Sequence, residues 1–417
     1  MSNNPVQKRS FSYLLKNVIG PAFLMVSTTV GAGSIVSAAT VGAQFGYQML
    51  WWVLVIVAFN ALYITIAYKY TLSTGEDLLT AIRTHYGKPL AILSSILMIF
   101  GYVTFSISNF TAIGMAINIL IPVIPRKVAS LCAFAIAMCL VWFGKNYYSK
   151  VSKIATYLVL VVTALFVITV FMLGGPDWGE VAVGFIPSLK PNAAGLAPVT
   201  LMMAMFGTST GATAPIFNSW QIKNGSTLTK DDLRNGTIKW DLIARNTGVF
   251  LMTALMICCG AIVLRPAGLS ISNGVDLVAI FEPVLGKLGA RYIFGIGFFG
   301  CTIMPYLMAP RMAATILATG LNKESNMDKP FSKVVVTIIM AFAAIFGLFN
   351  AAPPAQLMVL SQIGSAVSNP VVCVLLIMLV NRNELGEHKA KPTYTAALVI
   401  AYLLVMYATF RTVASFF

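Results

Sequence analysis

Eleven long apolar stretches most strongly limit how this chain of 417 residues can fold. A transmembrane helix needs about 20 mostly apolar residues, because the hydrocarbon layer of a bilayer is about 30 Å thick. The stretches cover approximately residues 19–44, 48–72, 89–122, 127–145, 151–174, 193–222, 240–264, 284–320, 331–350, 354–381 and 393–414. The loops between them are too short for a soluble domain. We therefore expect a single all-α transmembrane domain over residues 1–417.

The composition agrees with a membrane protein and excludes several other classes. Hydrophobic residues make up 58% of the chain and charged residues only 10%, whereas a soluble protein carries about 25% charged residues. A soluble enzyme, a disordered chain and a secreted disulfide scaffold are therefore excluded. The net charge of +15 reflects only 13 acidic residues spread over short loops. Since no basic patch forms, we expect no nucleic-acid partner.

The distribution of lysine and arginine predicts the orientation of the chain. With the N-terminus inside, 19 of the 28 basic residues fall in inner segments and 7 in outer ones. Positive residues concentrate on the cytoplasmic side of membrane proteins. We therefore expect a multi-pass protein with its N-terminus inside and its C-terminus outside. The lack of transit and sorting signals suits the cytoplasmic membrane of a bacterial cell.

Two of the stretches contain helix-breaking clusters at mid-span. The first has Thr-Thr-Val-Gly-Ala-Gly-Ser at 28–34, and the sixth has Gly-Thr-Ser-Thr-Gly-Ala-Thr-Ala-Pro at 207–215. Glycine is a poor helix former, and proline removes a backbone donor. Backbone groups freed inside a membrane must line a cavity or find partners on neighbouring helices. For one cluster alone, tight packing of small residues between two helices is an equally simple interpretation.

The positions of the two clusters favour a transporter. Each lies in the first helix of a five-helix half, and paired interruptions of this kind are typical of inverted-repeat transporters with a site at mid-membrane. The first repeat would cover about 19–174 and the second about 193–381, followed by an extra helix at about 393–414. A sensor or structural role is less consistent with this pattern, because a structural bundle gains nothing from two interrupted helices.

Several segments resemble the Nramp family of divalent-metal transporters. The stretch Gly20–Tyr47, GPAFLMVSTTVGAGSIVSAATVGAQFGY, is similar to the family's first helix. STGEDLLTAIRTHYGKP at 73–89 is similar to its TGKDL-type loop, and QLMVLSQ at 356–362, followed by Asn369-Pro370, resembles its tenth helix. The resemblance covers most of the chain. It implies a LeuT-type fold of 5+5 inverted repeats plus an eleventh helix, with helices 1 and 6 interrupted. It also implies alternating access and, in most members, proton-coupled manganese or iron uptake.

The sequence departs from the family at the metal-binding motifs. The family's Asp-Pro-Gly-Asn in helix 1 is matched by Gly-Ala-Gly-Ser at 31–34, so a glycine replaces the metal-binding aspartate. The family's Met-Pro-His in helix 6 is matched by Ala-Pro-Ile at 214–216, and no register restores the methionine or the histidine. The glutamine of helix 10 is retained as Gln362.

These departures remove the charged ligands of the family's site. All acidic residues and both histidines fall in loops or at helix ends, so we expect no carboxylate or imidazole at mid-membrane. Transition metals are held by imidazole, thiolate, thioether or carboxylate ligands, and Mg²⁺ is usually anchored by carboxylates. Proton relays inside membranes also use Asp, Glu and His chains. Proton-coupled manganese or iron transport in the family's manner is therefore not expected.

The expected substrate-binding residues come from the two interruptions and from helix 10. They are Gly31, Ala32, Gly33, Ser34, Thr208, Ser209, Thr210, Gly211, Thr213, Ala214 and Gln362. Asn109 and Arg311 are candidate accessory residues, and Gln362 and Ser34 would be the ligands if a metal binds. Arg311 would attract a carboxylate if it faced the cavity, or would extend to the inner interface. Arg245 is expected to be interfacial.

Two functions stay open at this point. The first keeps the family's class, with a largely hydrated divalent cation bound by neutral oxygens. The second is transport of a small zwitterionic or anionic solute such as an amino acid, whose carboxylate would bind at the Gly31–Ser34 interruption. The spans contain no acid–base or nucleophile constellation, so an enzyme is not expected, nor is a cofactor. The expected partners are the substrate and the lipid bilayer, and the expected assembly is a monomer.

Overall fold

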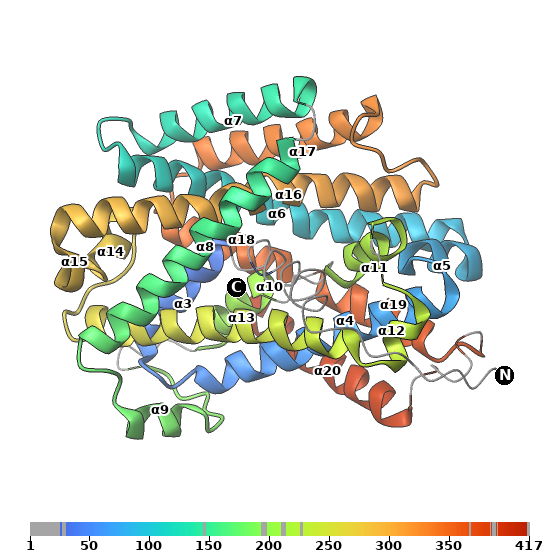
Figure 1. Ribbon diagram of the computed structural model, residues 1–417, viewed down its shortest axis with the longest axis horizontal. Helices are drawn as coiled ribbons and strands as arrows, with labels where there is room; N and C mark the ends of the chain where they lie inside the picture. Colours follow the sequence, from blue (N-terminus) through green and yellow to red (C-terminus); the bar gives the residue numbers. More distant parts are fainter. Residues whose placement is uncertain are drawn as a thin grey trace.

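The computed structural model describes residues 26, 31–144, 147–192, 198–209, 214–225, 228–366, 368–383, 385, 389 and 391–414. Every regular element in these ranges is a helix (Figure 1). Nine helical segments of this described part are long and apolar enough to cross a membrane. The prediction of an all-α transmembrane protein is confirmed.

The observed helices closely follow the predicted stretches. In the first half they are α3 (Ala32–Phe45), α4 (Leu50–Thr74), α5 (Leu78–Tyr86), α6 (Lys88–Leu120), α7 (Arg126–Phe143), α8 (Tyr147–Met172) and α9 (Trp178–Gly184). In the second half they are α10 (Val199–Ser209), α11 (Ala214–Gly225), α12 (Lys230–Arg234), α13 (Thr237–Cys259), α14 (Gly274–Ala279), α15 (Glu282–Gly289), α16 (Gly295–Gly320), α17 (Pro330–Phe349), α18 (Pro354–Ala366), α19 (Asn369–Val380) and α20 (Pro392–Ala414). Two π-helical segments, η2 (Gly260–Leu264) and η3 (Ala290–Phe294), extend α13 and precede α16.

Helices 1 and 6 are interrupted where the sequence predicts it. Gly31 is extended, with φ −89° and ψ −176°, and α3 begins only at Ala32, in the middle of the predicted stretch 19–44. In the sixth stretch, α10 ends at Ser209 and α11 begins at Ala214. Residues 27–30 and 210–213, which complete the two clusters, lie outside the described residues.

The tenth stretch, expected as one span over 354–381, contains two consecutive helices that together are long and apolar enough to cross a membrane. The first, α18, ends at Ala366, and the second, α19, begins at Asn369; residue 367 lies outside the described residues. Pro370 occupies the first turn of α19, where its missing N–H costs nothing because first-turn donors have no intrahelical acceptor. In mid-helix the same proline would interrupt the backbone hydrogen bonds, so Pro370 is the local sequence signal for the start of α19.

Small residues allow the helices at the centre to approach closely. Cβ atoms added to Gly101 and Gly320 would lie 2.6 Å from Ser368 Oγ and 2.1 Å from Ser95 Oγ, which brings α6 against α19 and α16. Such contacts drive helix association in membranes, where burial of apolar surface contributes little. The α6 and α16 helices cross the middle of the molecule side by side (Figure 1).

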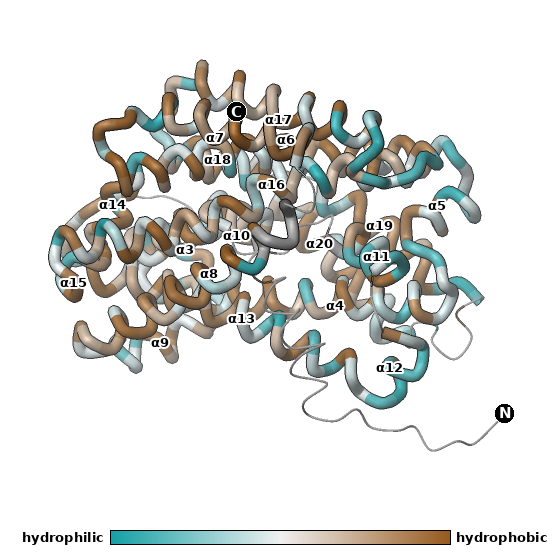
Figure 2. Tube along the Cα trace, turned by 45° about the horizontal axis from the view of Figure 1, so that its top comes forward, coloured by the Kyte–Doolittle hydropathy of each residue, from teal (hydrophilic) through white to brown (hydrophobic). Residues whose placement is uncertain are grey.

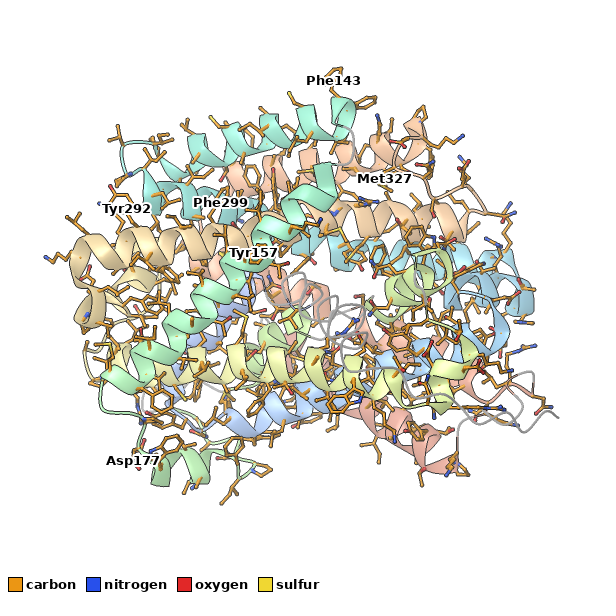
Figure 3. The ribbon with its side chains drawn as sticks, viewed as in Figure 1. Phe143, Tyr157, Asp177, Tyr292, Phe299 and Met327 are labelled. Carbon is orange, nitrogen blue, oxygen red and sulfur yellow. The ribbon has the colours of Figure 1, made fainter. Side chains whose placement is uncertain are left out.

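The outer surface of the bundle is apolar, as a lipid-facing surface must be. Phe143 at the end of α7 points away from the bundle (Figure 3) and is 85% exposed. Ile338 and Leu403, on α17 and α20, are also exposed. Hydrophobic residues cover most of the long helices, whereas hydrophilic ones gather around α5, α11 and α12 (Figure 2). That end holds loops that the charge distribution predicts to be cytoplasmic.

Candidate functional site

The start of α3 is buried and has no side-chain cap. Gly31 is the N-cap residue of α3 and, as a glycine, provides no side-chain cap. Residues 31–34 are all buried, and Ser34 is only 3% exposed. The N–H groups of a first turn have no acceptor four residues earlier in the helix and carry the positive end of the helix dipole; in α3, that of Ser34 donates to the carbonyl oxygen of Gly31 at 3.0 Å. An uncapped helix start inside the bundle is therefore a place where a polar ligand can bind.

Gln362 of α18 packs directly onto this helix start. Its side chain is fully buried, and its Nε2 donates a hydrogen bond to Ser108 Oγ of α6 at 2.7 Å. A Cβ atom added to Gly33 would lie only 2.0 Å from Gln362 Nε2. Glycine at position 33 is thus a steric requirement for this arrangement. Gln362 joins α3, α6 and α18 at one point.

The α10 helix reaches the same point through a second glycine. A Cβ atom on Gly207 would lie 2.1 Å from the carbonyl oxygen of Gln362. Ser365 Oγ donates to the carbonyl oxygen of Gly207 at 3.0 Å. Thr208 is buried, and its Oγ1 donates to the carbonyl oxygen of Met205 within α10. The end of α10 is therefore held against α18 beside the start of α3.

Three buried side-chain oxygens around the start of α3 have no hydrogen-bond partner among the described residues. They are Ser34 Oγ, Asn109 Oδ1 and Gln362 Oε1. Asn109 Oδ1 of α6 lies 3.6 Å from the position of a Cβ atom on Gly31, while Asn109 Nδ2 donates to Phe105 within its own helix. Buried polar atoms are nearly always hydrogen-bonded, so unpartnered acceptors mark places where a ligand can bind. We call these three oxygens the central oxygens.

The remaining predicted site residues divide into two groups. Ser209 and Ala214 are the helix ends on either side of the second interruption. Thr210, Gly211 and Thr213 lie outside the described residues. The structure therefore brings together residues 31–34, Thr208 and Gln362 with the accessory residue Asn109, and it adds Ser108, which sequence reasoning missed. In the sequence, only the position of Ser108, a hydroxyl residue directly before Asn109 in an apolar helix, could have pointed to it.

Arg311 lies apart from the central oxygens. It is six residues along α16 from Pro305, whose side chain contacts Gly31, a separation of about 9 Å along an α-helix. It lines a pocket of about 650 Å³ together with Trp220, Glu324 and Lys333. This pocket is bordered by α7, α11, α16, α17 and the loop after α16. Arg311 is thus closer to the end of the bundle that the charge distribution predicts to be cytoplasmic.

The described residues form no cluster of charged metal ligands at the central oxygens. Within the described residues, no three His, Cys, Asp or Glu side chains come close enough to hold a metal ion. The carboxylate of Asp241, on α13, is buried. The α13 helix contacts helix 1 at Gly248, which packs against Val26. Asp241 is seven residues earlier, about 10 Å along the helix. It lies toward the predicted inner end, away from Gly31.

The side chain of Arg245, expected near the membrane interface, is buried within the bundle. It is 6% exposed, and its Nη2 lies 3.4 Å from Asp241 Oδ2. A buried guanidinium is tolerated because a carboxylate one turn earlier on the same helix compensates its charge. In the sequence, the spacing of Asp241 and Arg245 at i and i+4 on one helix could have indicated this ion pair.

The chain matches a known family over almost its whole length. A family model described as "Natural resistance-associated macrophage protein-like" matches residues 22–415. The chain is 24% identical to the divalent metal cation transporter MntH of Brucella suis, over 93% of this chain and 86% of that protein. It is also 24% identical to a natural resistance-associated macrophage protein 2 homolog of Dictyostelium discoideum, over 93% of this chain and 62% of that protein.

Solved structures show the same architecture. The Eremococcus coleocola manganese transporter, in complex with an aromatic bis-isothiourea substituted compound, superposes with a TM-score of 0.79 at 17% identity, covering 100% of this chain and 92% of that one. Mhp1, a nucleobase-cation-symport-1 family transporter, superposes with a TM-score of 0.57 at 16% identity, covering 97% and 91%. The fold is therefore LeuT-type, with 5+5 inverted repeats plus an eleventh helix. With the family model matching residues 22–415, the chain belongs to the Nramp family of multi-pass membrane transporters.

Proposed function

We propose that this chain is a secondary transporter that works by alternating access and binds its cargo at the central oxygens. The observation that carries the proposal is the group of three buried, unpartnered neutral oxygens beside an uncapped helix start. Two helices interrupted at mid-span, α3 and the α10–α11 pair, border this point, and such interruptions are where transporters of this architecture bind their substrates.

The cargo that this site favours is a divalent cation that keeps much of its water. Relatives of the chain are named divalent metal cation transporters and a manganese transporter. Carboxylates normally anchor such ions, whereas the side chains that carry the central oxygens, Ser34, Asn109 and Gln362, are neutral. Neutral oxygens attract a cation less strongly than a carboxylate does. The ion would therefore bind weakly and exchange only part of its hydration shell.

A second candidate cargo is a small zwitterion such as an amino acid. The uncapped first turn of α3 favours it, because helix N-terminal N–H groups bind carboxylates. The central oxygens would accept hydrogen bonds from the ammonium group of the same molecule. This arrangement uses both donors and acceptors of the site, whereas a cation uses only the acceptors.

Uptake into proteoliposomes tests the proposal. Mn²⁺, Mg²⁺ and labelled amino acids are offered separately to the parent protein and to Gln362→Ala. Gln356→Ala is the matched control, because Gln356 lies on the same helix and is exposed. Saturable uptake that falls several-fold in Gln362→Ala but not in the control supports the site. The transported compound selects between the two cargos. Absence of uptake of all of them by the folded parent protein would refute the proposal.

Two features of the architecture are proposals as well. We infer that the repeats cover about 19–174 and 193–381, with α20 as the extra helix. We also infer that the N-terminus lies inside and the C-terminus outside a cell membrane.

We do not propose coupling to protons through the membrane centre, because such relays need titratable side chains. An inward proton gradient, applied in the same proteoliposomes, should leave uptake unchanged.

A further inference from the structure

We propose that Arg245 is a positioning residue for transport, which holds α11 in place through Asn218 and so controls how readily this helix moves. The inference rests on the proposed alternating-access function, but it does not depend on which cargo is carried. It concerns a group of four residues, Tyr68, Asn218, Asp241 and Arg245, which we call the Arg245 cluster.

The Arg245 cluster joins three helices through buried polar contacts. Arg245 Nη1 donates to Asn218 Oδ1 of α11 at 3.4 Å, and Nη2 contacts Asp241 Oδ2 of α13 at 3.4 Å. Tyr68 of α4 donates its hydroxyl to the same Asp241 oxygen at 2.9 Å. All four side chains are less than a tenth exposed. An ionisable group buried in a transmembrane helix marks a functional position by default.

Stability alone does not explain this cluster. A buried ion pair costs so much desolvation that apolar residues of similar volume stabilise a fold equally well or better. The Arg245 cluster is also incompletely satisfied, because Arg245 Nε is buried and has no acceptor among the described residues. A buried donor without an acceptor destabilises a fold, so the contacts of Arg245 do not stabilise the fold as fully as they could. The two contacts of Arg245, each 3.4 Å long, are long for hydrogen bonds. Such contacts suit an interaction that breaks when α11 moves.

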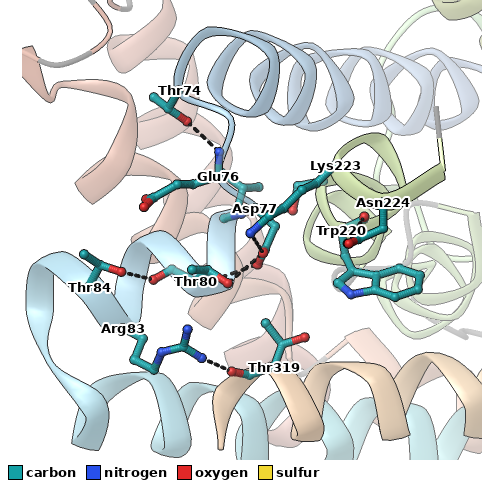
Figure 4. Close-up of polar contacts among 12 residues, drawn as sticks. Thr74, Glu76, Asp77, Thr80, Arg83, Thr84, Trp220, Lys223, Asn224 and Thr319 are labelled. Atoms are coloured by element: carbon teal, nitrogen blue, oxygen red, sulfur yellow. Dashed lines mark hydrogen bonds and ion pairs between the residues drawn. The ribbon is translucent and has the colours of Figure 1, made fainter. Parts of the chain in front are cut away.

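Further contacts connect α11 to the same side of the molecule. The backbone N–H of Leu78 donates to Ser219 Oγ at 3.1 Å, and Lys223 Nζ lies 3.2 Å from Asp77 Oδ2 (Figure 4). Asp77 also caps α5 by accepting from the backbone N–H of Thr80. The α11 helix therefore packs against α4, α5 and α16 and has a polar contact with α13. In contrast, α10, the other half of the interrupted helix, packs mainly against α18 and α3.

The division of contacts indicates that the two halves can move separately. The tie between Lys223 and Asp77 is about one-third exposed on the lysine side, and a partly exposed ion pair is screened and contributes little. The contact between Arg245 and Asn218 is buried, as is the bond from Leu78 to Ser219, but only the former joins α11 to a charged side chain of another long transmembrane helix. Among the polar contacts of α11 in the described residues, it is the one best suited to control the position of this helix.

Substitutions at Asn218 test the inference in two opposite directions. Asn218→Ala removes the acceptor for Arg245, whereas Asn218→Asp replaces it with a charged acceptor and shortens the contact. Amide hydrogen exchange of residues 214–225 is measured in the full-length purified protein without cargo. We expect exchange several-fold faster in Asn218→Ala and slower in Asn218→Asp. The control is Asn224→Ala, because Asn224 lies on the same helix, is exposed and bonds only to Trp220 within α11.

Transport provides a second readout. Mn²⁺ and Mg²⁺ uptake by Asn218→Asp should show a lower maximal rate with an unchanged half-saturating concentration, because the Arg245 cluster does not touch the central oxygens. A defect in folding would instead lower the amount of active protein and speed exchange throughout the chain. Unchanged α11 exchange in both variants, or a change in the same direction in both, overturns the positioning role.

An uncharged double variant provides a second test in case Asn218→Asp does not fold. Arg245→Gln combined with Asp241→Asn keeps similar side-chain volumes and removes both charges. It should loosen α11 as Asn218→Ala does, and parent-like exchange in this folded double variant would also overturn the inference. If the parent protein transports neither ion nor an amino acid, the proposed function fails, but the exchange series still decides whether Arg245 positions α11.

Discussion

At the scale of single residues, the site depends on a position that has no side chain. Any Cβ atom at position 33 would overlap the carboxamide of Gln362, which lies 2.0 Å from that point. Displacing Gln362 would break its hydrogen bond to Ser108 and leave a buried hydroxyl unpaired. Overpacking of this kind typically costs about 1–3 kcal/mol. Gly33 matches the glycine of the family's Asp-Pro-Gly-Asn motif and shapes the pocket, whereas the charged ligand of that motif is lost at Gly31.

Gly31 offers the most direct test of what the missing charge means. A Cβ atom there would lie 3.0 Å from Pro305 Cγ and 3.6 Å from Asn109 Oδ1, so a side chain enters the site if Pro305 shifts by a few tenths of an ångström. Gly31→Asp would add a carboxylate beside the central oxygens. We expect calorimetry to show Mn²⁺ binding at least about tenfold tighter, a gain of about 1.4 kcal/mol.

The control for this substitution is Gly31→Asn, which has the same shape without the charge. It should bind Mn²⁺ no better than the parent protein. Equal affinities of the aspartate and asparagine variants would show that a missing charge is not what weakens metal binding at this site.

At the scale of helices, interruptions place the site, and position along a helix decides which residues reach it. The interrupted helices 1 and 6 contribute the ends of α3 and α10, while α6 and α18 supply Ser108, Asn109 and Gln362. The uninterrupted α16 places Pro305 beside Gly31. Arg311, on the same helix, contributes to the separate inner pocket.

The separation along α16 predicts the effect of removing the charge of Arg311. Arg311→Gln should leave equilibrium binding of Mn²⁺ or of an amino acid at the central oxygens unchanged, because about 9 Å of helix separates the two positions. Calorimetry with the folded variant measures this, with Gln362→Ala as the variant that does weaken binding. A loss of affinity in Arg311→Gln as large as in Gln362→Ala would mean that Arg311 belongs to the cargo site.

At the scale of the whole molecule, charge is concentrated at one end of the bundle. Hydrophilic residues gather around α5, α11 and α12 (Figure 2), and the loop after α16 carries Glu324, Asp328 and Lys329. The excess of lysine and arginine predicts that this end faces the cytoplasm. The Arg245 cluster and the pocket beside Arg311 would then both lie on the inner side of the central oxygens.

Labelling of a single introduced cysteine tests this orientation. Ser325→Cys, made in a variant in which the exposed Cys132 and Cys139 are replaced by serine, lies in the loop after α16. An impermeant maleimide added to intact cells should not label it, but should do so after permeabilisation. Equal labelling of intact cells would place this loop outside and reverse the proposed topology.

The sequence allowed most of the fold to be predicted, but less of the site. Apolar stretch lengths located the spans; for example, 331–350 was predicted and α17 covers Pro330–Phe349. Glycine clusters located the interruptions of helices 1 and 6. The span 354–381 was located as well, but not the start of a separate helix, α19, within it, because a proline in the first turn of a helix leaves the apolar pattern on both sides intact.

By itself, the sequence determined that the chain spans a membrane many times, where two of its helices are interrupted, and that the family's charged ligands are missing. Each of these follows from residues that are neighbours along the chain. Only the tertiary structure decided which polar atoms meet. Gln362 and Ser108 are separated by 254 positions, and Arg245 is buried because Tyr68 and Asn218 arrive from two other helices. Inside a membrane, whether a polar group finds a partner depends on such distant contacts, and no local pattern records them.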